Sequence, residues 1–327
     1  MVLSERDVSV VDPWGPVTGA SAFSADRVAE LASEIDLHVP DSVLGATTAA
    51  LRSGKHVILT GPPGTGKSTL ARVVAQAAQE ALMCTGLLAA TATSDWTVAD
   101  TVGTSVEGAE GRGFRPGVVL EAIESGRWLL IDELNRADVD RAFGELFAVL
   151  AGQEVVLPHH RNEFAPPLAI VPPGASVPEN SDPICIPRSW RIIATMNTSD
   201  RGLLFTLSRA LMRRFAFVNV GSPEESIYEQ LVDGPGGMIS ALLPLRELQD
   251  IGPAIYLDAA DYAAIRACDD VDQSLILLEA FTAYLLPQLD AETVADGRLL
   301  ALLDNVLAPP EHEAARRLLS DFGAAAG

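Results

Sequence analysis

Residues 56–69, HVILTGPPGTGKST, decide the fold that this sequence can adopt. The apolar run 57–59 predicts a buried strand, and a helical pattern begins after the glycines at 61, 64 and 66. Glycines at this spacing let a backbone fold around a phosphate group and turn its N–H groups toward the phosphate oxygens. We therefore predict a phosphate-binding loop made of Gly61, Pro62, Pro63, Gly64, Thr65, Gly66, Lys67, Ser68 and Thr69.

Two side chains of this loop carry the chemistry of a nucleotide site. Lys67 is expected to place its ammonium group on the β- and γ-phosphates, and Ser68 is expected to be a magnesium ligand at the start of the helix. A purely structural loop is the alternative. It is disfavoured because the motif is complete and lies between an apolar strand and a helix.

The stretch RWLLIDELNRAD, residues 127–138, predicts a second buried strand that ends in two acids. Burying a carboxylate is costly, so Asp132 and Glu133 are expected to face a site at the carboxyl end of that strand. Asp132 would hold Mg²⁺ through water, and Glu133 would orient or deprotonate the attacking water. An ordinary strand capped by acids is the alternative.

A third strand is predicted at RIIATMN, residues 191–197. Its last residue, Asn197, would emerge beside Asp132, where an amide can hold the attacking water or the γ-phosphate. A solvent-facing turn residue is the alternative for Asn197. Shortly after it, the stretch ALMRRF brings Arg213 and Arg214 together in an acidic chain, which raises the question of their target.

Composition restricts the classes of function. A chain of 327 residues with 48% hydrophobic residues can bury a large core, and its net charge of −21 repels polyanions, which argues against nucleic-acid binding by this chain alone. The apolar runs are shorter than the ~20 residues of a membrane span, and the N-terminus lacks a signal-peptide pattern. We expect a cytoplasmic protein with no membrane partner. Three separated cysteines are expected to be reduced, mostly buried thiols: Cys84, Cys185 and Cys268.

The chain divides into three regions by pattern. Residues 1–40 form an arm with one helical stretch that Ser24 or Asp26 could cap, and residues 41–221 alternate strands with helices. The predicted strands are 56–61, 87–92, 127–134, 191–197 and 215–220, and the predicted helices are 68–82, 117–125, 139–152 and 204–214. Residues 222–327 show only amphipathic helical patterns. The alternation predicts a parallel sheet covered by helices on both faces, followed by a smaller all-helical domain. Neither terminal region is long enough for an effector domain, so we expect that part on another protein.

The motifs GPPGTGKST, LLIDELNRA and ATMNTSDRG with ALMRRF together resemble those of AAA+ ATPases. The resemblance is to the MoxR/McrB-like, dynein-related branch, and it is closest to McrB-type motor subunits. It implies a P-loop NTPase fold, with a five-stranded parallel sheet flanked by helices and a C-terminal helical lid.

The same resemblance implies a homo-oligomer, normally a hexameric ring, with nucleotide at the subunit interfaces. Arg213 and Arg214 would then act on the neighbouring copy's phosphoryl group, and Arg214 aligns best with the family's arginine finger. Asn135 and Arg136 would line the interface, with a helix cap as the alternative for Asn135. Salt bridging is the favoured interpretation of Arg201 and Arg209, and no arginine stands at the usual second sensor position.

ATP with Mg²⁺ is the expected ligand. GTP stays open because NTSD, residues 197–200, is similar to the NTAD of McrB-type GTPases. The resemblance implies that hydrolysis drives a separate partner, which would be a nuclease subunit for a McrB-like protein or a von Willebrand A-type protein for a MoxR-like one. A nucleotide-dependent switch or scaffold and a small-molecule kinase are the alternatives, and the kinase is disfavoured because it has no use for Glu133 or a trans arginine pair.

Two further stretches are open to more than one interpretation. The glycine-rich stretch around Phe114 predicts a hairpin or loop that is similar to the branch's pore insertion, with packing on its own subunit as an equal alternative. His159 and His160 fall in a region, 157–185, that is expected to be an exposed hairpin. A metal site there is the weaker interpretation.

Overall fold

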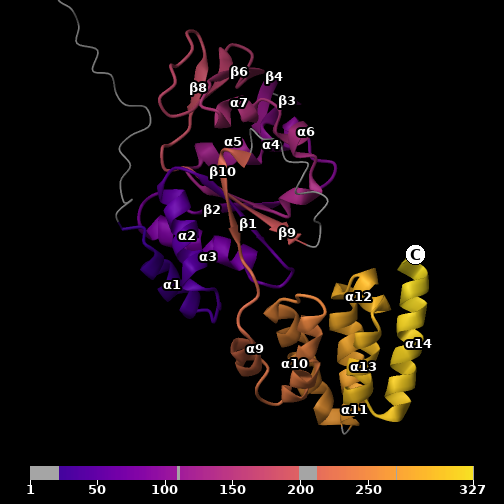
Figure 1. Ribbon diagram of the computed structural model, residues 1–327. Helices are drawn as coiled ribbons and strands as arrows, with labels where there is room; N and C mark the ends of the chain where they lie inside the picture. Colours follow the sequence, from indigo (N-terminus) through magenta and orange to yellow (C-terminus); the bar gives the residue numbers. More distant parts are fainter. Residues whose placement is uncertain (1–21, 109–110, 199–211, 270, 327) are drawn as a thin grey trace, which may run out of the picture.

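The computed structural model describes residues 22–108, 111–198, 212–269 and 271–326 (Figure 1). The helix predicted at 204–214 lies almost wholly outside these residues, as do Arg201 and Arg209. Among the described helices, none combines the length and the apolar character needed to cross a bilayer.

The centre of the molecule is a five-stranded parallel sheet with the order β10-β1-β9-β5-β2. Its strands are β1 (His56–Gly61), β2 (Leu87–Thr91), β5 (Trp128–Asp132), β9 (Ile192–Asn197) and β10 (Phe215–Asn219). The apolar residues of β1, β5 and β9 are almost completely buried, as continuous apolar runs predict for strands covered on both faces. The predicted fold is confirmed, and the polar residues that end these strands meet at one edge.

Helices cover this sheet in the order that the sequence pattern predicts. They are α1 (Ala25–Ser33), α2 (Asp41–Arg52), α3 (Lys67–Glu80) and α5 (Val118–Glu124). Ser24 caps α1, since its Oγ accepts a hydrogen bond from the N–H of Arg27 at 3.2 Å. Phe23 lies edge-on to Trp128, with 5.8 Å between ring centroids. The helix of the arm therefore belongs to the same core as the sheet.

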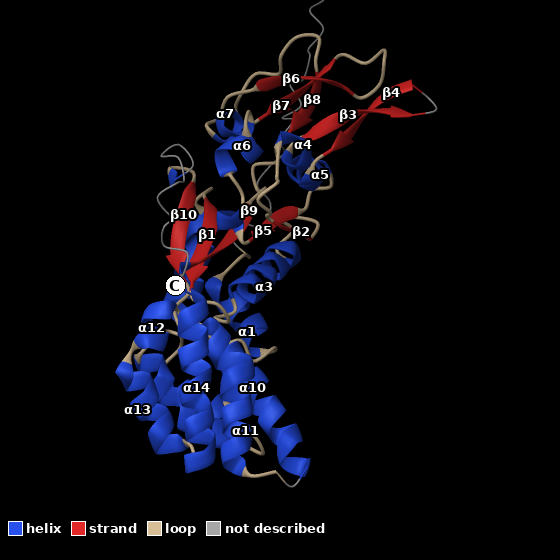
Figure 2. Ribbon diagram, turned by 90° about the vertical axis from the view of Figure 1, so that its right-hand side faces the viewer, coloured by secondary structure: helices blue, strands red, loops and turns tan. Residues whose placement is uncertain are grey.

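Two small sheets are inserted into this framework, and both lie at the end of the molecule away from the C-terminal helices (Figures 1 and 2). The first is a hairpin of β3 (Gly103–Gly108) and β4 (Gly111–Pro116), which follows α4 (Val98–Thr101). The second combines β6 (Val155–His160), β7 (Pro167–Val171) and β8 (Asp182–Cys185). The helix predicted before it is divided at Gly144, whose φ of 42° separates α6 (Val139–Phe143) from α7 (Leu146–Leu150).

The C-terminal helices form a second hydrophobic cluster of their own. They are α9 (Glu225–Leu231), a 3₁₀ stretch (Gly237–Glu247), α10 (Pro253–Arg266), α11 (Gln273–Ala280), α12 (Ala291–Ala295), α13 (Gly297–Val306) and α14 (Pro309–Ala326). Tyr228, Tyr256 and Phe281 are fully buried at the centre of this cluster. The arrows of β1 and β10 point toward these helices, so the carboxyl edge of the sheet faces them (Figure 2).

Candidate functional site

The loop between β1 and α3 has the backbone conformation that its glycines predict. Gly64 and Gly66 have φ of 75° and 79°, in the left-handed region that favours glycine. A Cβ atom on Gly61 would lie 2.1 Å from the carbonyl oxygen of Val220, so this position admits only glycine for reasons of space. The Oγ1 of Thr65 donates to the carbonyl of Pro62 at 3.0 Å and closes the turn.

Lys67 begins α3 and is 7% exposed. Its ammonium group donates to the carbonyl oxygens of Gly61 at 2.9 Å and Pro62 at 2.6 Å. Burial lowers the pKa of Lys67 to about 8, while the carboxylates of Asp132 and Glu133 act in the opposite direction. A phosphate group placed in this loop would add the negative charge that favours the ammonium form.

Asp132 joins the loop to two strands. Its Oδ1 accepts a hydrogen bond from the Oγ of Ser68 at 2.7 Å and a short one from the Oγ1 of Thr195. A hydroxyl and a carboxylate side by side are the oxygen donors that Mg²⁺ prefers, so Ser68 and Asp132 fit the metal that the sequence predicts. They would hold the ion where it can neutralise charge on the phosphates.

Glu133 has a left-handed backbone conformation, with φ of 55°. Such a conformation is costly for a residue with a side chain, and it persists only where its surroundings hold it. Here the N–H of Glu133 donates to the Oγ1 of Thr195 at 3.0 Å, and its Oε2 lies 2.6 Å from the Nε of Arg136. Arg136, expected at an interface, is 64% exposed and paired with this carboxylate.

Asn197 ends β9 directly opposite Gly61 in the register of β1 and β9. The register therefore places Asn197 at the same end of the sheet as the phosphate loop, in the strand next to β5. Thr195, two residues earlier, is a functional candidate that the sequence argument missed. A polar residue two positions before Asn197 in an apolar strand lies on the same face, and that periodicity was the available signal.

Arg213 and Arg214 lie at the opposite end of the parallel strands from the phosphate loop, where β10 begins. The carbonyl of Arg214 accepts from the N–H of His56 at 3.1 Å, and the carbonyl of Arg213 accepts from the Nζ of Lys55 at 2.8 Å. The Nη2 of Arg214 donates to the carbonyl of Ala151 at 3.1 Å, at the end of α7. The structure therefore does not bring these arginines to the phosphate loop of their own chain.

The insertion around Phe114 is a hairpin in which the aromatic ring packs inward. Phe114 lies 5.3 Å from the ring of His159, and it is half-buried against the core. The Nδ1 of His159 lies 3.0 Å from the Oγ of Ser105. In contrast, Phe164, in the loop between β6 and β7, is 92% exposed. This packing agrees with the second interpretation of Phe114, contact with its own subunit.

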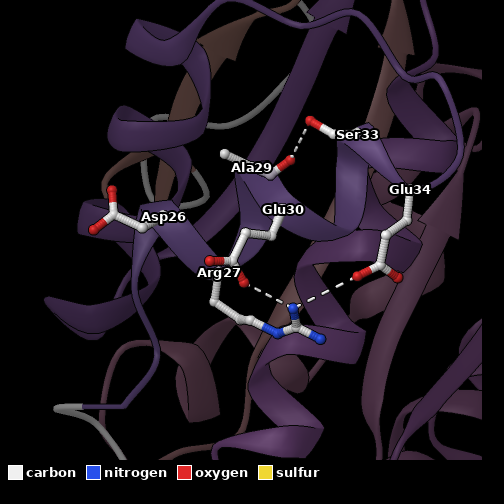
Figure 3. Close-up of a pocket in the computed structure, with 6 residues that line it drawn as sticks. All are labelled: Asp26, Arg27, Ala29, Glu30, Ser33 and Glu34. Carbon is white, nitrogen blue, oxygen red and sulfur yellow. Dashed lines mark hydrogen bonds and ion pairs between the residues drawn. The ribbon is translucent and has the colours of Figure 1, made fainter.

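Two hollows adjoin the N-terminal helices. One is an open face of α1 where Arg27 makes ion pairs with Glu30 at 2.8 Å and Glu34 at 3.6 Å (Figure 3). Arg27 also pairs with Glu80 of α3 at 2.8 Å. The ion pair between Arg27 and Glu80 therefore connects α1 to α3.

The other hollow is a cavity of about 290 Å³ between the α1–α2 link and the start of α9. The Cδ1 of Leu37 lies 2.6 Å from where a Cβ atom of Gly66 would be, so the cavity adjoins the phosphate loop. Its lining comes from two parts of the chain. Leu37, His38 and Val39 belong to the α1–α2 link, and Pro223 and Ile227 belong to the C-terminal helical unit, residues 222–326.

A parallel sheet with a phosphate loop after its first strand and acids at the end of β5 defines the P-loop class of nucleotide-binding proteins. Residues 56–215 match the model of the AAA domain, dynein-related subfamily. The sequence-based assignment to the AAA+ fold is therefore confirmed.

Curated relatives match about half of the chain. The chain is 29% identical over 153 residues, 47% of its length, to midasin of Giardia intestinalis. It is 28% identical over 208 residues, 57% of its length, to the type IV methyl-directed restriction enzyme EcoKMcrB subunit of Escherichia coli (strain K12). It spans only 3% of that midasin and 39% of the EcoKMcrB subunit.

A solved crystal structure also overlaps most of the chain. It is a provisionally assigned ATPase from Cytophaga hutchinsonii ATCC 33406, 14% identical in sequence, with a TM-score of 0.40. The overlap covers 90% of this chain and 86% of that one.

Proposed function

We propose that this protein hydrolyses ATP, with Mg²⁺, at sites shared between copies of the chain. In this proposal Lys67 contacts the β- and γ-phosphates, Ser68 and Asp132 hold Mg²⁺, Glu133 activates the attacking water and Asn197 positions that water or the γ-phosphate. The domain division at about residues 41 and 222 is part of the same proposal. It agrees with the two hydrophobic clusters, except that the helix of the arm packs with the sheet.

The observation that carries this proposal is the position of the arginines at the edge of the sheet opposite the phosphate loop. β1 runs from His56, which pairs with Phe215, to Gly61, which begins the loop. At ~3.3 Å per residue, the two edges are roughly 17 Å apart, which is more than an arginine side chain spans. Arg213 and Arg214 therefore cannot reach the phosphate loop of their own chain, which supports the proposal that they act on a neighbouring copy, where such a residue is worth ~10³–10⁵ in rate.

The base of the nucleotide would occupy the cavity beside Gly66. Its apolar lining of Leu37, Val39 and Ile227 suits the face of a purine, and backbone and side-chain polar atoms at its rim, including those of His38, could distinguish adenine from guanine. We propose ATP as the preferred nucleotide, with GTP as the second candidate. Turnover of the two nucleotides at equal concentration, with Mg²⁺ present, tests this preference.

Hydrolysis would be used on a separate partner protein. The match to an AAA domain supports an oligomer that works with an effector. As the sequence resemblance implies, that effector would be a nuclease subunit for a McrB-like protein or a von Willebrand A-type protein for a MoxR-like one. A nucleotide-dependent switch with little mechanical output is the second candidate function. The proteins that co-purify with the Glu133→Gln variant, which should remain bound to nucleotide, distinguish these possibilities.

A mixing experiment tests the shared site. Lys67→Ala and the double variant Arg213→Ala/Arg214→Ala should each be inactive, whereas their mixture should recover hydrolysis because intact half-sites meet at some interfaces. The double variant Arg316→Ala/Arg317→Ala, on the exposed face of α14, is the control for loss of two charges. A mixture that co-assembles but recovers no activity would refute the shared site.

A further inference from the structure

The turn at residues 251–254, which leads into α10 and includes its first two residues, contacts the phosphate loop through its backbone. The N–H of Gly252 donates to the carbonyl of Pro63 at 3.2 Å, and the N–H of Ala254 donates to the carbonyl of Gly64 at 3.2 Å. The helical unit is therefore hydrogen-bonded to the loop by main-chain atoms. This connection does not depend on a sensor arginine, which the sequence lacks at the usual position.

Glycines on both sides make this close approach possible. A Cβ atom on Gly252 would lie 2.3 Å from both the carbonyl oxygen of Pro63 and the carbonyl carbon of Gly64. A Cβ atom on Gly64 would lie 3.2 Å from the Cγ1 of Ile255. Gly252 has φ of −67° and ψ of 155°, which any residue adopts. Space, rather than backbone conformation, therefore requires glycine at position 252.

The two accepting carbonyls belong to peptide units of the phosphate loop itself. The unit between Pro63 and Gly64 ends in the N–H of Gly64, and the unit between Gly64 and Thr65 ends in the N–H of Thr65. The described peptides are trans, so the C=O and N–H of each unit point in opposite directions. A phosphate that accepts from such an N–H polarises the unit and strengthens the hydrogen bond at its carbonyl.

A buried tyrosine holds the turn in place. The hydroxyl of Tyr228 donates to the carbonyl of Ile251 at 2.7 Å, and the side chain of Tyr228 is fully buried. The guanidinium of Arg246 lies 3.6 Å above the centre of the Tyr228 ring and donates to the carbonyl of Pro223 at 3.1 Å. Tyr256 packs edge-on to the same ring, with centroids 5.5 Å apart. The core of the helical unit therefore fixes where the turn meets the loop.

We propose that the 251–254 turn is the joint by which occupancy of the phosphate loop sets the position of the helical unit, with Gly252 admitting the contact and Tyr228 acting as a positioning residue. This inference rests on the proposed nucleotide site. Because coupling between sites is reciprocal, a nucleotide should hold the turn on the loop, and the seated turn should strengthen nucleotide binding.

The test uses the full chain and the Mg²⁺ complex of the ATP analogue AMP-PNP. Gly252→Ala should weaken AMP-PNP binding about tenfold, within the range of typical coupling free energies. Gly297→Ala is the matched control, because no atom lies within 4 Å of the added Cβ, and it should stay within about twofold of the parent protein. Tyr228→Phe should weaken binding about threefold to tenfold, whereas Tyr262→Phe, which loses a hydrogen bond to Glu279 in the same helical unit, should have no effect.

Amide hydrogen exchange supplies a readout that a merely structural role would not move. In the parent protein, AMP-PNP should slow exchange both in the loop, residues 61–69, and in the turn, residues 251–255. In the free protein, Gly252→Ala should speed exchange in both segments relative to Gly297→Ala. If Gly252→Ala does not fold, the same comparison between Tyr228→Phe and Tyr262→Phe takes its place.

The outcomes separate this inference from the proposed function. Slowed exchange in the loop with an unchanged turn would overturn the joint while leaving the nucleotide site intact. Absence of AMP-PNP binding would overturn the proposed function, and the comparison of free proteins would still decide whether the turn and loop are coupled. Exchange in Gly252→Ala equal to that of the parent in both segments would overturn the joint.

Discussion

Replacing Thr195 by valine should uncouple Glu133 from the rest of the site without changing its charge. The side chain of Thr195 is 2% exposed, and its hydroxyl has two partners: it donates to Asp132 and accepts from the N–H of Glu133. Valine keeps the shape and removes both hydrogen bonds. The N–H of Glu133 is then left without this acceptor, which costs about 1–3 kcal/mol for a buried group.

Part of this cost should appear in catalysis, because the left-handed backbone of Glu133 depends on that hydrogen bond. A loss of about 1.4–2.8 kcal/mol from the transition state lowers kcat about 10- to 100-fold. The assay is ATP turnover at saturating nucleotide, with binding of AMP-PNP measured separately. Binding should change little, because the phosphate loop keeps Lys67 and its glycines.

Thr195→Ser is the matched control, since it restores the hydroxyl and should recover most of the turnover. Urea unfolding at neutral pH measures the stability of each variant and identifies a general loss of structure. A Thr195→Val protein that is folded and turns over ATP within about twofold of the parent would refute the role assigned to this hydroxyl.

Further expected outcomes concern other parts of the molecule. Glu133→Gln should bind nucleotide normally but lower turnover by ~10²–10⁴, since an amide cannot accept a proton; normal single-turnover kinetics would contradict its role as base. Burial and the charges of Arg191 and Lys55 lower the pKa of His56 to about 3. Between about pH 3 and pH 6.5, His56 is therefore protonated in the unfolded chain but neutral in the folded chain. The free energy of unfolding should therefore decrease as the pH drops below about 6.5, by about 1 kcal/mol at pH 5 once the partial exposure of His56 is allowed for. Urea unfolding at several pH values measures this decrease, which should be smaller in His56→Asn. Phe164→Ala should leave the melting temperature unchanged, whereas Phe114→Ala should lower it by removing a ring packed on His159; equal melting temperatures would contradict that packing.

The sequence was sufficient where local pattern and chemistry coincide. The apolar runs predicted the five strands, and the acids and amide that end β5 and β9 predicted one edge of the sheet, because parallel strands that end in polar residues bring them together. The break at Gly144 was not predicted. A helical hydrophobic pattern continues across that position, and only the positive φ of 42° shows where the chain turns.

Contacts between distant segments could not be predicted from local patterns. Thr195 lies 62 positions from Glu133, and a threonine in a strand carries no signal of which backbone N–H it will accept from. The turn at Gly252 contacts Pro63 through main-chain atoms, and every non-proline residue has the same main-chain N–H donor. The inward packing of Phe114 depends on the strand register that places the hairpin against β6, which composition does not determine.

β1 and β10 together set the distance between the two halves of the proposed site. At one end of this pair, the N–H of His56 donates to the carbonyl of Arg214, and at the other end Gly61 packs against the carbonyl of Val220. Five consecutive register pairs connect these points in a buried sheet. A close-packed sheet does not shorten, so one chain cannot bring its arginines toward its own phosphate loop by a local motion. In the proposed mechanism, positive charge from this end of the sheet therefore acts on a second copy of the chain, and the phosphate loop of each copy depends in turn on arginines that another copy presents.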